Sequence, residues 1–401
     1  MARLALVVPA HSYRGNDFLA AATPHQLTIV TDAEEPLGGD HIVRSSLSLD
    51  ASETDRLAQV LVERSVEAVI GVDEYSVQLA ADVSDRMGLS HGRGEAIRRA
   101  THKDQLRSTL DRAELPQPSW HVADSVAAID VDWLERALGP GPWVLKPLDR
   151  TASEGVVRVD ASTLAWGRDQ LAAVVGSHAP VLAETFVPGA EIAVEAILTD
   201  GALEIVTVFD KPDIGDGPTF WEATYLAPSS IPLSVIEEVR VLIERAARAL
   251  DLHTTPIHAE LRLPEGRPVI IELAPRTIGG RCARAIRLDD GRHLEDLVIE
   301  RALNQPRTIP AARRGGPIGI WMLPTPHDGT FEGLDGVEVA AAIPGVERIE
   351  MTTTAGTTVY APPRTRSYLG FVFVSGRSRR RVLSTLDQVR SVLRPRVAPA
   401  S

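Results

Sequence analysis

The clearest alternation of apolar and polar positions lies between residues 257 and 284. Two apolar runs, at 257–263 and 269–274, flank Pro264-Glu265-Gly266, a combination that favours a tight turn. The pattern therefore predicts a β-hairpin of two antiparallel strands.

Alternation along these strands brings two acidic side chains together. Pairing of the apolar positions puts Glu260 and Glu272 on the same side, roughly 5–8 Å apart. The expected faces are His258, Glu260 and Arg262 on one strand, and Ile270, Glu272 and Ala274 on the other. Bare carboxylates at the near end of that range repel by roughly 3 kcal/mol at an effective dielectric of about 20. A shared divalent cation relieves this repulsion, and oxygen ligands suit Mg²⁺. The alternative is a sheet with one solvated face that carries two glutamates.

The first 95 residues alternate between strand and helix patterns. Apolar runs at 4–10, 27–32 and 68–73 predict strands, and the stretches 54–65 and 75–88 predict helices. This order favours a parallel sheet. No G-x-G-x-x-G follows the first strand, so the dinucleotide-binding fingerprint is absent and the unit is expected to line a substrate site.

Only three of the 42 basic residues are lysines, and all three lie in candidate motifs. Lys103 lies near the middle of a helix predicted over 93–115. Lys146 lies on a strand that precedes the small polar loop 151–155, where backbone N–H groups can converge on an anion. The ammonium group suits phosphate oxygens. The alternatives are a solvated helix lysine and a flexible hairpin tip.

Two further stretches carry candidate ligands. Residues 181–198 predict strand, turn and strand, with Glu184 before the turn and Glu191 after it; backbone edges there can bind adenine and a carboxylate can bind ribose, although a simple hairpin fits too. The loop 207–232 is rich in glycine, proline and aspartate, and it carries three candidates for phosphate, metal or substrate contacts: Lys211, Trp221 and Glu222.

After the hairpin, Arg276 is followed by Gly279-Gly280. The arginine can stabilise a transferring phosphoryl group or an oxyanion, and the two glycines allow the backbone to approach it closely. Cys282 is expected to be a small buried apolar residue, since no histidine has an obvious claim as its base. Strands at 319–324 and 368–376 and a basic helix at 378–393 end the chain.

Composition and charge exclude several classes of function. The 401 residues are 44% hydrophobic and 24% charged, as in an ordinary globular protein with room for two or three domains. A net charge of −12 disfavours nucleic acid or an anionic membrane as partner. No run approaches 18 apolar residues, the N-terminal run is too short for a signal peptide, and the single cysteine fits a reducing cytoplasm. We therefore expect a cytoplasmic protein.

The order Lys103, KP (146–147), TASEGV, ETFVPGAEIAVE and HAEL…IIELAPRTIGG resembles the ATP-grasp superfamily of carboxylate–amine ligases over roughly 90–300. DKPDIGDGPTFWEATYLAPS, PRTIGGRCARAI and YLGFVFV resemble, more narrowly, the bacterial L-amino-acid ligases, which make dipeptides. The resemblance implies an α/β fold, α+β in its C-terminal part. A Rossmann-like pre-ATP-grasp domain is expected at 1–95, an ATP-grasp domain at 96–307 with a nucleotide lid at about 116–190, and an α+β domain at 308–401.

The resemblance also implies roles for individual residues. ATP is expected to contact Lys103, Lys146, Ser153, Gly155, Val156, Glu184, Phe186, Val187 and Glu191. Mg²⁺, or Mn²⁺, is expected on Glu260 and Glu272, although Ala274 stands where many members have a metal-binding asparagine. Catalytic contacts are expected from Arg276, Lys211 and Gly280, and substrate contacts from Glu222, His258, Trp221 and Arg284.

The implied reaction joins a carboxylate, for which an amino acid is the expected substrate, to an amine through an acyl phosphate, with release of ADP and phosphate. A homodimer is the expected assembly. An ATP-grasp carboxylase or kinase, a carboxylate–thiol ligase and a non-catalytic nucleotide-binding module stay open as alternatives. A NAD-dependent oxidoreductase is disfavoured by the missing glycine fingerprint.

Overall fold

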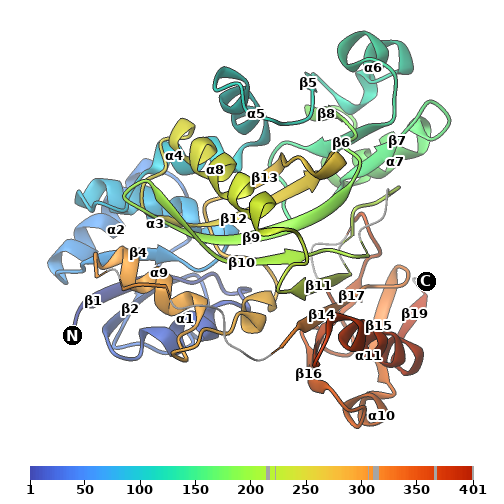
Figure 1. The fold of residues 1–401 in the computed structure, drawn as a ribbon. Coiled ribbons are helices and arrows are strands. Elements are labelled where there is room, and N and C mark those ends of the chain that lie inside the picture. Colours follow the sequence, from blue (N-terminus) through green and yellow to red (C-terminus); the bar gives the residue numbers. More distant parts are fainter. Residues whose placement is uncertain (214–216, 222, 306, 310–315, 365–367, 400–401) are drawn as a thin grey trace.

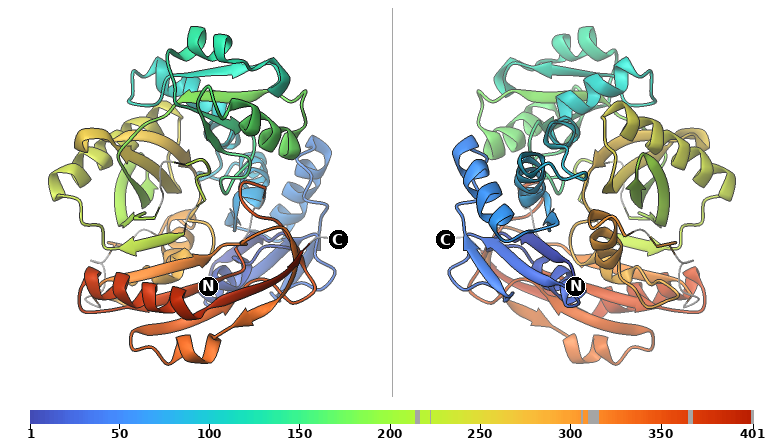
Figure 2. Two further views of the ribbon diagram at one scale, coloured as in Figure 1. Left: turned by 90° about the vertical axis from the view of Figure 1, so that its right-hand side faces the viewer. Right: turned by 90° about the vertical axis from the view of Figure 1, so that its left-hand side faces the viewer.

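The computed structural model describes residues 1–213, 217–221, 223–305, 307–309, 316–364 and 368–399. Figure 1 shows three β-rich regions around a long central sheet, and Figure 2 shows the same molecule from two sides. None of the helices in these ranges has the length and apolarity that crossing a membrane requires.

The N-terminal part is a four-stranded parallel sheet in the order β3-β2-β1-β4. Its elements are β1 (Arg3–Val7), α1 (Gly15–Ala22), β2 (Gln26–Thr31), β3 (His41–Arg44), α2 (Ala51–Glu63), β4 (Ala68–Gly71) and α3 (Glu74–Met87). The three predicted strands and two predicted helices are confirmed. The short elements β3 and α1 were not predicted, because four and eight residues are too few to establish a periodic pattern.

The single helix predicted over 93–115 is two helices, α4 (Gly94–Thr101) and α5 (Lys103–Arg112). His102 between them has extended backbone angles, φ −90° and ψ 114°. The backbone N–H of Lys103 donates instead to the carbonyl of Leu148, 3.2 Å away, in the loop after β6 (Trp143–Pro147). Lys103 therefore begins a helix rather than lying in the middle of one.

A second four-stranded sheet, antiparallel and in the order β5-β8-β6-β7, covers one end of the molecule (Figure 2). Its further elements are β5 (Trp120–Ala123), η1 (Val126–Ala128), α6 (Val131–Leu138), β7 (Val157–Val159), α7 (Leu164–Val175) and β8 (Val181–Thr185). The strand after β8, β9 (Ala190–Thr199), pairs in another sheet. Residues 186–189 are thus a crossing between two sheets, and 181–198 is not a hairpin.

The central sheet has eight antiparallel strands in the order β13-β12-β9-β10-β11-β14-β18-β16. Its remaining elements are β10 (Ala202–Asp210), β11 (Thr224–Ala227), α8 (Leu233–Ala249), β12 (Thr255–Leu263), η2 (Pro264–Gly266), β13 (Val269–Ala274), β14 (Ile318–Leu323), β16 (Val346–Met351) and β18 (Gly370–Ser375). Strands expected in two domains share this sheet, because β11 pairs with β14 (Figure 1). The domain boundary at 307/308 stays a prediction.

The C-terminal part adds a three-stranded sheet in the order β17-β15-β19. Its elements, with the segments that precede it, are η3 (Cys282–Ala285), α9 (Leu294–Ala302), β15 (Gly329–Asp335), α10 (Val337–Ala341), β17 (Thr358–Val359), α11 (Arg379–Val392) and β19 (Arg394–Pro399). A parallel N-terminal sheet followed by antiparallel sheets with helices is the mixed α/β architecture that the sequence predicted.

The hairpin β12–β13 is confirmed, with one change of register. Glu260 is the direct partner of Glu272, but Leu261 pairs with Ile270, so a β-bulge falls at Ile271. The bulge turns Ile270 into the apolar core, which also contains Leu261 and Leu273. The expectation that Ile270 shares a face with Glu272 is therefore wrong, because the extra residue reverses the alternation.

Candidate active site

Glu260 and Glu272 lie where two cavities meet. A cleft of about 640 Å³ opens on one side of the pair, and an open cavity of about 1970 Å³ opens on the other. Both glutamates line both cavities. Directly opposite residues of an antiparallel pair have Cβ atoms about 4.5–5.5 Å apart. The two carboxylates are therefore close enough to share one cation.

The pair is asymmetric in its contacts. Glu260 Oε1 lies 3.1 Å from Lys211 Nζ and 3.4 Å from His258 Nε2. No hydrogen bond or ion pair joins Glu272 to another described residue, although its charge raises the pKa of Arg276. A carboxylate without a protein partner beside a second carboxylate is a suitable donor set for a divalent cation. Ala274 is buried on β13 and offers no side-chain donor. Among the described residues no group of three or more His, Cys, Asp or Glu side chains could hold a metal ion.

The smaller cleft collects most of the residues predicted to bind nucleotide. It lies between the four-stranded antiparallel sheet and the β12–β13 hairpin. Its predicted members are Lys103, Lys146, Ser153, Val156, Glu184, Phe186, Val187 and Glu191. Gly155 does not line it; its N–H donates to the carbonyl of Pro363 at 2.8 Å, and its φ of +74° requires glycine.

The charges at the base of this cleft are buried and paired. Glu184 accepts from Arg107 Nε at 2.6 Å and lies 2.6 Å from Lys146 Nζ. Burial raises the pKa of Glu184, but Arg107 and Lys146 outweigh it and the net pKa is lowered. Burial lowers the pKa of Lys146, against the attraction of Glu184. Arg107 was not predicted, because its sequence neighbours are those of any helix surface.

A second paired network crosses β9 and β12. Glu191 accepts from Lys211 Nζ at 2.5 Å through one oxygen and from Arg262 Nε at 2.8 Å through the other. Arg262 also donates to the carbonyl of Val187 at 3.1 Å, and its guanidinium lies 5.0 Å from the Phe186 ring centre. Glu191 is thus the counter-ion of two cations, a role that the sequence did not predict for it. Lys211 is buried against Glu191 and Glu260, and it is not among the residues that line either cavity.

His258 is held by an acidic residue that sequence reasoning missed. Glu195, on β9 and 1% exposed, accepts from His258 Nδ1 at 2.5 Å and from the N–H of Ile278 at 2.8 Å. Burial lowers the pKa of His258, but Glu195 and the hydrogen bonds outweigh it and raise the pKa to about 9. The alternation along β9 placed Glu191 and Glu195 on one face, which was the available signal.

The larger cavity lies at the carboxyl ends of β1, β2 and β4. Such edges are where ligands bind in open parallel sheets. Its polar wall consists of His11, Ser12, Tyr13, Arg14, Asp32, Asp73, Glu74 and Tyr75. The opposite wall comes from the segment after β13 and from the C-terminal strands. Sequence analysis predicted a substrate site here without naming these residues, because loop residues carry no periodic signal.

Arg276 projects into this cavity and is tied to the N-terminal wall. Its Nε donates to Glu74 Oε2 at 2.5 Å and its Nη1 donates to the carbonyl of Thr277 at 3.0 Å. Burial lowers the pKa of Arg276, but Glu74 and Glu272 more than offset it, so the pKa is raised. The guanidinium therefore stays charged beside Glu74 and Glu272.

Gly280 lines the cavity, but its N–H donates to the hydroxyl of Tyr13 at 3.0 Å. Burial raises the pKa of that phenol. The φ of Gly280 is +61°, and a Cβ on this residue would lie only 2.8 Å from the Phe371 ring, so glycine is required here. Cys282 is buried as predicted, with Sγ 3.8 Å from Met322 Sδ.

Two of the predicted substrate residues line neither cavity. Arg284 contacts Asp17 at 2.7 Å and Glu350 at 2.6 Å and does not line either cavity. Trp221 packs on Tyr368, with ring centres 4.3 Å apart, and is absent from both linings. Glu222 lies outside the described residues.

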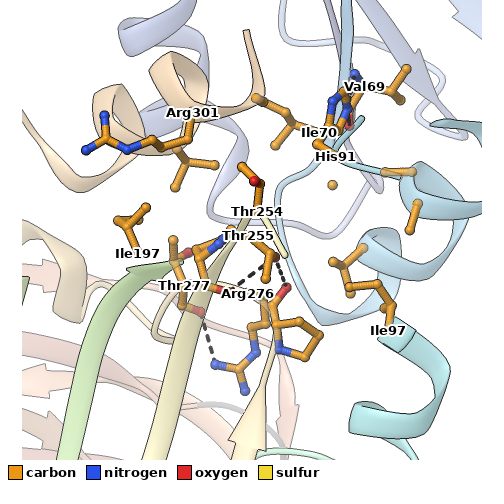
Figure 3. Close-up of a pocket in the computed structure, with 18 of the residues that line it drawn as sticks. Val69, Ile70, His91, Ile97, Ile197, Thr254, Thr255, Arg276, Thr277 and Arg301 are labelled. Carbon is orange, nitrogen blue, oxygen red and sulfur yellow. Dashed lines mark hydrogen bonds between the residues drawn. The ribbon is translucent and has the colours of Figure 1, made fainter. Parts of the chain in front are cut away.

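A third pocket, of about 620 Å³, lies behind Arg276 between the N-terminal part and β12 (Figure 3). Most of its lining is apolar, with Val69, Ile70, Ile97 and Ile197 among its members. Figure 3 shows the Arg276 guanidinium turned away from Val69 and His91. Arg276 and Thr277 line this pocket and the larger cavity, whereas Glu260 and Glu272 are not among the residues that line this pocket.

The comparisons with known proteins agree with this geometry. An ATP-grasp domain matches residues 140–285, and L-amino acid ligase C-terminal domain 2 matches residues 321–398. An uncharacterised protein, y4rH, of Sinorhizobium fredii is 26% identical over 91% of this chain and 77% of its own length. A D-alanine--D-alanine ligase of Azoarcus is 27% identical over 51% of this chain and 66% of its own length.

Two solved structures share the fold. The L-amino acid ligase of Bacillus licheniformis superposes with a TM-score of 0.81 at 23% identity, over 100% of this chain and 99% of that one. The N5-carboxyaminoimidazole ribonucleotide synthetase of Thermotoga maritima gives a TM-score of 0.73 at 16% identity, over 99% and 100%. The chain therefore contains an ATP-grasp domain followed by the C-terminal domain 2 of the L-amino acid ligases.

Proposed function

We propose that this ligase joins the carboxylate of one amino acid to the amino group of another, through an acyl phosphate, and releases ADP and phosphate. The observation that carries the proposal is that Glu260 and Glu272 line both the smaller cleft and the larger cavity. A γ-phosphoryl group in the cleft and a carboxylate in the cavity then meet at the same two side chains.

ATP is assigned to the smaller cleft. Lys103 and Lys146 are the proposed phosphate contacts. The proposed adenine contacts are Phe186, Val187 and Glu184. Glu191 is the proposed ribose contact, and it also holds Lys211 and Arg262 in place. Ser153 and Val156 line the cleft from the loop that closes over the phosphates, with Gly155 as its glycine turn.

Mg²⁺, or Mn²⁺, fits Glu260 and Glu272, whose oxygens are hard donors of the right charge. When bound, the ion would neutralise phosphoryl oxygens and so make the phosphorus easier to attack. Ala274 contributes no ligand, which leaves part of the coordination to water or phosphate. Lys211, 3.1 Å from Glu260, supplies a fixed positive charge to the same region.

The chemistry needs two displacements. A carboxylate oxygen of the first substrate attacks the γ-phosphorus and ADP leaves. The amine of the second then attacks the acyl carbon, phosphate leaves with the former carboxylate oxygen, and the ammonium proton is lost. Arg276 would stabilise the negative oxygen of the tetrahedral intermediate, since its charge is held beside Glu272.

Water must be kept from the acyl phosphate. Two backbone contacts tie the segment that follows the 151–155 loop to other parts of the chain and support a role for it in excluding water: the N–H of Gly155 donates to the carbonyl of Pro363 at 2.8 Å, and that of Arg158 donates to the carbonyl of Pro218 at 2.8 Å. We also propose that the chain divides into three domains, with boundaries at 95/96 and 307/308. We propose further that it forms a homodimer, which analytical ultracentrifugation tests.

The test is the dependence of ADP formation on both substrates. We expect ADP and phosphate to appear only when amino acids that supply a carboxylate and an amine are present with ATP and Mg²⁺. A carboxylate kinase would turn over without the amine. AMP and pyrophosphate as products would contradict the mechanism.

A further inference from the structure

The larger cavity has one wall that is a surface of the hydrophobic core. Tyr225, Ile278, Cys282 and Met322 line the cavity and belong to the same buried cluster, and each is at most 2% exposed. Tyr368 packs against this cluster and lines the cavity too. We call these five residues the apolar floor.

The apolar floor and the glutamate pair line the same cavity. Tyr225 is on β11, and its ring centre lies 5.6 Å from Lys211 Nζ, which is 3.1 Å from Glu260 Oε1. Ile278 follows Arg276 by two residues, and its N–H is fixed by Glu195. In an amino acid the reacting carbon or nitrogen is only two bonds from Cβ. A substrate side chain must therefore lie within a few bond lengths of the reacting centre, where the floor begins.

We propose that one of the two amino acids that are joined places an apolar side chain, of leucine, methionine or phenylalanine size, on this floor. This inference rests on the proposed function and specifies its substrate class. Each methylene group buried there strengthens binding roughly four-fold. The sulfur atoms of Cys282 and Met322, 3.8 Å apart, give a polarisable surface that accepts thioether and aromatic groups.

The floor itself disfavours charged side chains. None of its five members carries a charge, and Lys211 nearby is already held by Glu191 and Glu260. A charged substrate group would lose its water against these five residues, which offer it no counter-ion of their own. The charged and polar wall is the opposite one, formed by the loops after β1, β2 and β4.

Gly279 leaves room for the side chain. It lines the cavity, it is exposed, and a Cβ at this position would meet no heavy atom within 4 Å. Its φ is not positive, so other residues can adopt its backbone. The neighbouring Gly280 differs, since a Cβ there would lie 2.8 Å from Phe371. A side chain at 279 can therefore narrow the cavity without disturbing the core.

The experiment measures kcat/KM for ADP formation with alanine as the fixed partner and a second amino acid drawn from alanine, serine, aspartate, lysine, leucine, methionine and phenylalanine. Leucine, methionine or phenylalanine should exceed alanine at least ten-fold, and aspartate and lysine should fall below alanine. In Gly279→Leu the ratio of phenylalanine to alanine should fall at least ten-fold, with Gly279→Ala in between.

Ala341→Leu is the matched control, because it adds the same apolar bulk at an exposed position of α10; its ratios should equal those of the parent. Aspartate or lysine reacting as well as leucine, or Gly279→Leu leaving the ratio within two-fold, overturns the inference while amine-dependent ADP formation upholds the proposed function. No ADP formation with any pair counts against the proposed function itself. Calorimetric titration of phenylalanine and aspartate into the protein with Mg·ADP then decides the inference separately, since tighter aspartate binding would overturn it.

Discussion

Glu260 on β12 is the direct cross-strand partner of Glu272 on β13, and both side chains line the smaller cleft and the larger cavity. Lys211 and His258 lie beside Glu260, whereas Glu272 has no hydrogen bond or ion pair with any described residue. The charge of Glu272 favours the charged form of Arg276, but no hydrogen bond or ion pair with a described residue holds its carboxylate. Under the proposed function this carboxylate is a metal ligand.

Glu272→Gln tests this directly. Glu272 makes no hydrogen bond or ion pair with a described residue, and its attraction for Arg276 is opposed by its repulsion of Glu260. The variant should therefore unfold within about 1 kcal/mol of the parent. Its ATP-dependent turnover should fall by roughly 10²-fold or more, and Mg²⁺ with ADP should no longer raise its melting temperature. Glu265→Gln, an exposed change at the turn of the same hairpin, is the control. A Glu272→Gln protein with parental turnover would remove the metal assignment.

Glu184→Ala, unlike Glu272→Gln, should strongly lower the free energy of unfolding. It leaves Arg107 and Lys146 buried without their carboxylate, a loss of the kind that costs about 3–5 kcal/mol. Chemical denaturation monitored by circular dichroism measures it. Stability close to that of the parent would mean that the two cations find other partners.

Arg276→Lys should lower kcat by about 10²- to 10³-fold, because a lysine lacks the planar guanidinium whose Nε holds Glu74 while its other nitrogens can face a developing oxyanion. Steady-state kinetics at saturating substrates measures the loss. Arg245→Lys, exposed on α8, is the control for the exchange of arginine for lysine. An effect on KM alone would assign Arg276 to substrate binding rather than to the transition state.

The hairpin and its two glutamates were predictable because period-two alternation and a Pro-Glu-Gly turn fix strands and facing side chains locally. The bulge at Ile271 was not, since an extra residue leaves no mark in the apolar pattern. Contacts between residues far apart in sequence were also missed, because a local pattern contains no information about them. Glu195 meets Ile278, and Tyr13 meets Gly280, only after the sheets assemble.

The helix 93–115 shows the complementary limit. Its composition is helical throughout, but a tertiary hydrogen bond from Lys103 to Leu148 divides it, and local propensity contains no information about that bond. Arg284 was predicted to contact substrate because it belongs to a motif. In the structure it forms ion pairs with Asp17 and Glu350 instead.

His258 predicts a pH dependence of stability. Its pKa is raised from 6.5 to about 9 in the folded protein, so its contribution is fully present below about pH 6.5 and is lost as the pH rises through 9. The expected loss is roughly 3 kcal/mol of unfolding free energy between pH 6.5 and 9.5. Urea denaturation of the parent and of His258→Gln isolates it, because the variant should lack this component. Equal slopes for the two proteins would show that His258 is neutral.

The most direct measurement follows oxygen from carboxylate to phosphate. The amino acid that supplies the carboxylate is labelled with ¹⁸O in both carboxyl oxygens, and the phosphate from a single turnover is analysed by mass spectrometry. An acyl phosphate formed beside Glu260 and Glu272 predicts one ¹⁸O atom in each phosphate released and one in each new amide. Phosphate without label, or label recovered in AMP, would contradict the account.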